Sequence, residues 1–235
     1  MSRTVNLNGR SVRVSGRTAV VGSAIPDSDV YYKIDEGSGS TLANENGDST
    51  YNATLTGTPN WNEGADAHHG RYVIVNENDR IEVDNTDGGQ LIDFNSDFSI
   101  GVEVFVDSSG LSDNATIWEY SDGNKSMFCT KIGTDTLLSG YYNGSSRLGQ
   151  YQATTPSPPY QANFFVQFDA STKETTLFVN EVEGSPSSGS GGFGLRDDPL
   201  TFGVDTSGNN NGPMNQGISA IAIWKSIVNP SKFVI

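Results

Sequence analysis

Residues 98–106, with the sequence FSIGVEVFV, alternate between apolar side chains and small or polar ones. The apolar positions are Phe98, Ile100, Val102, Val104 and Val106, and the positions between them are Ser99, Gly101, Glu103 and Phe105. Successive side chains of a β-strand point to opposite faces of its sheet, so a period of two predicts a half-buried strand here.

Short apolar segments of the same kind recur along the chain, at residues 115–120, 136–142, 163–168, 175–179, 200–204 and 218–224. Runs of Gly, Asn, Asp and Ser separate them, and no window shows a long helical period. The pattern predicts an all-β fold, a two-sheet antiparallel jelly-roll sandwich of about a dozen strands. Strands resume on both sides of residues 185–192, SPSSGSGG, so this run is interpreted as a hairpin loop within one domain.

The first 29 residues follow a different pattern. Two short alternating segments, TVNL and RSVRV, flank Asn8 and Gly9, and Asn-Gly between alternating segments is a strong signal for a two-residue hairpin. The run TAVVGSAI at 18–25 predicts one more short strand. We therefore divide the chain into an N-terminal hairpin arm, residues 1–29, and a sandwich domain, residues 30–235.

Charge separates the arm from the rest of the chain. The arm holds four arginines before the first acid, Asp27, and these are Arg3, Arg10, Arg13 and Arg17. The whole chain has 14 Lys and Arg against 28 Asp and Glu, so setting the arm's arginines aside leaves a body of about −18. Nucleic acid is excluded as a partner of that body, because phosphate contacts need clustered Lys and Arg.

The acidity itself has two explanations that the sequence leaves open. One is an ordinary acidic surface that aids solubility, and the other is a halophilic surface adapted to high salt, where repulsion between carboxylates is screened. The longest apolar run, at 218–224, is too short to cross a bilayer, and the N-terminus has no apolar signal segment. We expect no membrane insertion.

Four segments, in order, carry a resemblance to a known family. They are residues 31–61, with DEGSG, a Gly-Asp turn, ATL and Trp61; residues 94–109; residues 175–185, TTLFVNEVEGS; and residues 215–233. Together they resemble the concanavalin A-like, laminin G-like jelly-roll domains. Two positions depart from that family's pattern: Glu103 or Val104 stands where a Trp is usual, and Glu181 stands where the hairpin glycine is usual.

This family includes lectins, glycosidases, adhesion modules and virion proteins, so the resemblance leaves the function open. Its glycosidases place carboxylates on one strand. Glu82 and Asp84 share a face here, but Thr86 stands at the next alternate position, and Glu103 has no acidic neighbour two residues away. We expect the chain not to be an enzyme, and a glycoside hydrolase is the weaker alternative.

The resemblance also implies candidates for binding. Many relatives hold a structural calcium ion near the Asp-Gly turn, and Asp48 is the nearest match, although no complete ligand set is visible and no other cofactor is expected. Exposed aromatic rings could bind sugar, and the candidates are Tyr141, Tyr142, Tyr151 and Tyr160. The alternative is that these rings fill the sandwich. A strand turns one ring of the adjacent pair inward and the other outward.

These observations together favour a non-enzymatic structural or adhesion module of a larger assembly. A virion protein of a tailed virus fits best, as a capsid decoration, turret or tail fibre that attaches to host surface glycans. The basic arm would dock on an acidic body, either that of another copy or that of another protein of the assembly. Alternatively, the arm covers an edge of its own sandwich. The alternative function for the whole chain is that of a free carbohydrate-binding lectin or of an extracellular, cell-surface adhesion domain.

Overall fold

The structure is a computed structural model that is almost entirely β. It describes residues 3–7, 10–14, 27–63, 71–76, 79–85, 91–92, 94–121, 126–142, 147–188, 200–203 and 213–233. Within these ranges there are nineteen strands and two short 3₁₀ turns, η1 (Ser49–Tyr51) and η2 (Pro230–Phe233). None of the helical segments in this part of the chain has the length and hydropathy to cross a membrane.

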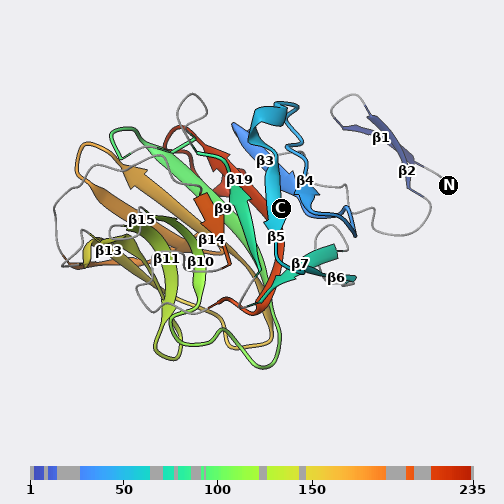
Figure 1. Cartoon of the computed structure of the whole chain (residues 1–235). Helices are drawn as coiled ribbons and strands as arrows, with labels where there is room; N and C mark the ends of the chain where they lie inside the picture. The colour runs from blue at the N-terminus through green and yellow to red at the C-terminus, as the bar shows by residue number, and fades with distance from the viewer. Residues whose placement is uncertain are drawn as a thin grey trace.

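Two antiparallel sheets form a sandwich, which confirms the predicted fold class (Figure 1). The nine-stranded sheet runs in the order β17 (Ser185–Ser188), β13 (Arg147–Thr154), β12 (Thr136–Tyr142), β11 (Ser126–Ile132), β10 (Thr116–Ser121), β18 (Leu200–Phe202), β8 (Arg80–Val83), β5 (Ala53–Thr56), β4 (Thr41–Leu42). The eight-stranded sheet runs in the order β16 (Val182–Glu183), β15 (Glu174–Val179), β14 (Tyr160–Asp169), β9 (Phe98–Val106), β19 (Gln216–Trp224), β7 (Arg71–Val75), β6 (Asn60–Glu63), with β3 (Val30–Lys33) also paired to β19.

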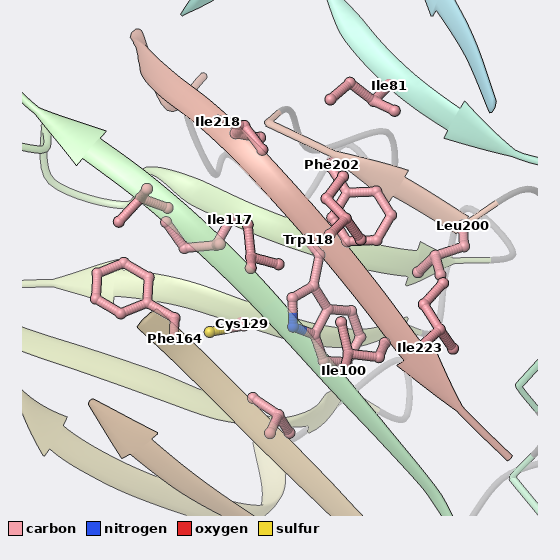
Figure 2. Close-up of a cluster of buried hydrophobic side chains, with 14 of the residues drawn as sticks. Ile81, Ile100, Ile117, Trp118, Cys129, Phe164, Leu200, Phe202, Ile218 and Ile223 are labelled. Carbon is pink, nitrogen blue, oxygen red and sulfur yellow. The ribbon is translucent and has the colours of Figure 1, made fainter. Parts of the chain in front are cut away.

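The core lies between the two sheets. The apolar positions of β9 all face it, and Ile100 pairs with Ile223 of β19 in the centre of the eight-stranded sheet. Figure 2 shows the indole of Trp118 reaching from β10 toward these two residues, beside Cys129. Cys129 is fully buried, and burial raises the pKa of its thiol.

The outer face of β9 is buried as well, which corrects the prediction of a half-buried strand. Gly101 lies directly under the ring of Phe233, because a Cβ at Gly101 would stand 2.5 Å from that ring. Phe105 is half-buried and stacks on Tyr72 of β7 with the ring centroids 4.9 Å apart. The period of two correctly predicted a strand. It could not reveal that residues far away in the sequence cover the outer face of that strand.

The C-terminal segment forms part of that cover. The main-chain carbonyl of Val228 accepts a hydrogen bond from Gln167 at 2.7 Å, and that of Ser226 accepts one from Ser99 at 2.9 Å. At its end, Phe233 packs edge-on against Trp224 at 6.1 Å. Residues 225–233 therefore lie across the outer face of the eight-stranded sheet.

The arm contains the predicted hairpin. β1 (Arg3–Leu7) pairs antiparallel with β2 (Arg10–Val14), and Leu7 stands opposite Arg10, as a two-residue connection requires. The two strands form a sheet of their own, which Figure 1 shows beside the sandwich. Residues 8–9, the strand predicted at 18–25 and Arg17 lie outside the described residues.

The cover over Gly101 yields a prediction of stability. Phe233→Ala should lower the free energy of unfolding by about 3–5 kcal/mol, because it removes a buried ring and opens the face of β9. Ile227→Ala, in the same segment but at a position 43% exposed, is the control and should stay within about 0.5 kcal/mol of the wild type. Denaturant unfolding measures both. Equal effects of the two changes would contradict the covering role of Phe233.

Candidate functional site

One side edge of the sandwich is closed by a short segment that passes from one sheet to the other. β16 pairs with β15 in the eight-stranded sheet, and β17 pairs with β13 in the nine-stranded sheet. Gly184 joins them, and a Cβ there would lie 2.0 Å from the carbonyl oxygen of Gln152. Only glycine permits this approach. Part of the loop predicted at 185–192 is therefore an edge strand, because its main chain finds a partner in β13.

A tight turn leads into this crossing. Asn180 and Glu181 connect β15 to β16, and both have positive φ, 50° and 65°, as a type I′ turn requires. Asn180 suits this backbone, and its Oδ1 accepts a hydrogen bond from the main-chain N–H of Asn163 at 2.9 Å. Glu181 does not suit it, so the departure noted in the sequence is a point of local strain. The turn places Val182 at the surface with 69% of its area exposed.

A groove of about 440 Å³ lies beside this turn, where the edges of the two sheets meet. Its lining combines apolar and hydrogen-bonding groups, contributed by Thr136, Gln152, Ala153, Thr154, Val179, Val182, Glu183, Gly184 and Ser185. Val179 continues the core, whereas Val182 is largely exposed to solvent. Little in the sequence pointed to this site, because its members come from separate strands and only the altered hairpin at Glu181 was unusual.

Tyr151 of β13 connects the core to the groove. Its ring packs against the core, and its hydroxyl donates a hydrogen bond to Glu183 Oε1 at 2.7 Å. That hydrogen bond, together with burial and the Glu183 and Glu174 charges, raises the pKa of Tyr151 to about 12. The contact holds the Glu183 carboxylate at the side of the groove.

Tyr160 lies at the same end of the sandwich. It begins β14, four residues before Phe164, and the two rings lie 6.5 Å apart. Burial, with a contribution from the Asp135 charge, raises the pKa of Tyr160 to about 12. Asp135 immediately precedes Thr136 of the groove, and Tyr151 contacts Glu183 of its lining.

The other two predicted tyrosines lie elsewhere. Tyr141 and Tyr142 end β12, whereas Thr136 begins it, so they stand about 20 Å along the strand from the groove. Tyr141 is fully buried and packs on Phe94, with ring centroids 5.2 Å apart, and the structure removes it from the ligand-binding set. Tyr142 is half-buried on the opposite side. One ring of this adjacent pair therefore points inward and the other outward, as predicted. The four candidate tyrosines do not form one site.

The candidate catalytic acids are not brought together. Glu82 lies on β8 in the nine-stranded sheet, and Glu103 lies on β9 in the eight-stranded sheet. Glu82 accepts hydrogen bonds from Thr56 and Arg80, both at 2.7 Å. Burial alone would raise its pKa, but these two contacts lower it below the usual value. Asp84, beside it, is exposed.

Glu103 is only 3% exposed and is held by other side chains, because Gln161 donates to its Oε1 at 2.6 Å and Ser219 donates to its Oε2. A further acid, Glu119, had no signal in the sequence, and the register places it two strands from Glu82 with Thr201 between them. Glu119 is fully buried, so a substrate cannot reach it in this structure.

Asp48 has a structural role. It caps η1, and its Oδ1 accepts the main-chain N–H of Thr50 at 3.0 Å. In the loop before it, the Asn44 side chain accepts from Tyr31 N and donates to Asp48 O. No group of three or more His, Cys, Asp or Glu side chains positioned to hold a metal ion occurs in the described ranges. The calcium site at Asp48 stays a prediction without support from this geometry.

Neither a family model nor a curated protein matches the chain. Solved structures do match it. Domain 4 of AbnA, a GH43 extracellular arabinanase from Geobacillus stearothermophilus, solved in complex with arabinotriose, has a TM-score of 0.60 and 19% identity over 86% of this chain and 94% of that one.

The binding domain of botulinum neurotoxin serotype D/C has a TM-score of 0.65 and 13% identity over 89% of this chain and 51% of that one. Botulinum neurotoxin type C, which interacts with two ganglioside molecules, has a TM-score of 0.63 and 12% identity over 88% of this chain and 50% of that one. The chain thus spans about half the length of the neurotoxin chains. The likeness establishes a β-sandwich fold shared with carbohydrate-binding domains.

The contact at the side of the groove can be tested by titration. Glu183→Gln should lower the pKa of Tyr151 from about 12 toward the ordinary value near 10, because the negative charge that stabilises the protonated phenol is lost. The measurement is the ultraviolet absorbance of tyrosinate against pH, with the Tyr151→Phe spectrum subtracted. Glu181→Gln, in the adjacent turn, is the control and should leave the titration unchanged. An unshifted Tyr151 in Glu183→Gln would show that the contact does not form in solution.

Proposed function

We propose that this chain is a non-enzymatic, carbohydrate-binding adhesion module built into a larger assembly, and that the groove beside β16 and β17 is its sugar site. The observation that carries the proposal is the exposed Val182 beside the Tyr151–Glu183 pair, in a groove with both apolar and hydrogen-bonding groups.

The lining suits a sugar. A pyranose or furanose ring offers C–H faces and hydroxyls, which can contact Val179 and Val182 on one side and the Thr136, Thr154 and Ser185 hydroxyls on the other. The volume, about 440 Å³, falls in the range of small-ligand sites and is large enough for a short oligosaccharide.

The fold supports the same function by analogy. The structural neighbours include an arabinanase domain in complex with arabinotriose and a neurotoxin that interacts with gangliosides. One of these ligands is a neutral oligosaccharide, and the others carry sialic acid carboxylates. The fold is therefore compatible with either class, and the analogy does not choose between them.

The positions of the acids support a role without catalysis. Glu82 and Glu103 lie on different sheets, each carboxylate is held by neighbouring side chains, and Glu119 is buried. Hydrolysis of a glycosidic bond needs two carboxylates that reach the same bond. Binding without turnover is the function that these residues support best.

The arm supports membership of an assembly. β1 and β2 form a two-stranded sheet separate from the sandwich, and such a hairpin is marginally stable in water unless it packs on something. Its four arginines oppose an acidic body of about −18, so another copy or another acidic structural protein is a suitable partner. A virion protein of a tailed virus, a capsid decoration, turret or fibre that attaches to host glycans, combines both properties.

The sugar site predicts a specific loss of binding. Val182→Asp should weaken binding to the glycans recognised by the wild type by at least about tenfold, because it places a charge where an apolar C–H face would rest. Val182 is 69% exposed, so the free energy of unfolding should change by no more than about 0.5 kcal/mol. A glycan array followed by titration calorimetry measures binding. Ile227→Asp, at another exposed apolar position, is the control that should bind normally. Unchanged binding by Val182→Asp would reject the groove.

The role of the arm is tested by deleting residues 2–28. The sandwich should keep its circular dichroism spectrum, because the described part of the arm contributes no strand to either of its sheets. Self-association or incorporation into the assembly should be lost, as measured by size-exclusion chromatography with light scattering. A truncated chain that unfolds would favour an arm that covers its own sandwich, and one that associates as well as the full chain would reject docking.

A further inference from the structure

The described residues that line the groove carry a negative charge and no positive one. None of them is Lys or Arg, and Glu183 contributes a carboxylate to the wall. Asp135 stands next to Thr136, and its charge acts on Tyr160, as the Glu183 charge acts on Tyr151. The Glu183 and Asp135 charges thus have the same sign.

Two described lysines near this edge are engaged elsewhere. Lys131 lies on β11, whose last residue pairs with Thr136, but its Nζ is 3.0 Å from Asp113 Oδ1. Lys173, on the turn before β15, donates from Nζ to the carbonyl oxygen of Phe94 at 2.6 Å. Neither of these ammonium groups is directed toward a ligand in the groove, so nothing in the described lining would compensate an anionic sugar.

The same carboxylate is well suited to hydroxyl donors. Glu183 accepts one hydrogen bond from Tyr151 at Oε1, and an ionised carboxylate has about four acceptor sites. Adjacent hydroxyls of a sugar can donate to the remaining sites, and hydrogen bonds to an ionised acceptor are stronger than neutral ones. Tyr151 holds the acceptor in place, which reduces the entropy lost on binding.

We propose that the groove selects neutral sugar chains and that Glu183 rejects those carrying a carboxylate. This inference rests on the proposed function, because it assigns the ligand class of the same groove. A sialic acid or uronate group placed beside Glu183 would meet a carboxylate of the same charge, whereas the neutral counterpart would donate hydrogen bonds to it. Neutral chains should therefore bind at least about tenfold more tightly than their anionic counterparts.

The experiment uses the full chain on a glycan array that carries neutral oligosaccharides beside the same oligosaccharides extended with sialic acid or oxidised to uronates. Wild type should bind neutral members of these pairs and discriminate against the anionic ones by at least about tenfold. In Glu183→Gln the discrimination should fall to within about threefold, because the repulsion is gone while the amide can still accept from Tyr151. Glu181→Gln, which removes an equal charge outside the lining, is the matched control and should discriminate as the wild type does.

Each outcome decides between the two proposals. The inference is wrong if the wild type binds anionic members as tightly as neutral ones, or if Glu183→Gln keeps full discrimination. In either case the carbohydrate-binding function still stands. Absence of binding to every glycan on the array would overturn both. Loss of discrimination in Glu181→Gln as well would show that the overall acidity, and not Glu183, rejects anions, which also contradicts the inference.

Discussion

The central pair of strands, β9 and β19, must be covered on both faces. Their inner faces pack into the core between the sheets, and every residue of β19 is buried. The outer face of β19 is also apolar at Ala220, Ala222 and Trp224, so the sandwich needs a second cover outside its two sheets. The C-terminal segment contributes to this cover, with Phe233 over Gly101, and a larger residue at 101 would displace it. A sheet centre closed in this way leaves binding to the edges.

The edge at β16 and β17, where the groove lies, is shaped by its backbone geometry. Gly184 lets the chain pass between the sheets in contact with β13, and the turn before it sets both Asn180 and Glu181 at positive φ. A non-glycine residue such as Glu181 raises the free energy of the folded state by about 1–2 kcal/mol in this conformation. The pairing of β14 with β15 must offset that cost. Strain of this kind is found preferentially at functional sites, where it fixes the position of neighbouring side chains. Here the neighbours are Val182 and Glu183.

The acidic composition has a partly structural origin. Asp48, Asp107 and Asp169 each accept a hydrogen bond from the main-chain N–H two residues further on, at 3.0, 2.7 and 2.7 Å. Contacts from Ser109 to Asp107 and from Ser171 to Asp169 lower the pKa of each acid. These aspartates stabilise turns between strands, and a sandwich with many short strands needs many turns. A share of the negative charge therefore follows from the fold, in addition to whatever solubility or salt requires.

The sequence by itself determined the main strands of the core, because alternation at residues 98–106 and the apolar segments at 115–120 and 218–224 report local periodicity. The pairing of β1 with β2 follows from a two-residue connection. The sequence also indicated that the tyrosine pair at 141–142 is split between two faces. Only the tertiary structure decided what covers β9, because Phe233 and Gly101 are far apart in the chain. It also removed Tyr141 from the binding set and assembled the groove from β12, β13, β15 and the segment at 182–185. Sites built across two sheets depend on which strands become edges, and that follows from the pairing of the whole chain and not from any local pattern.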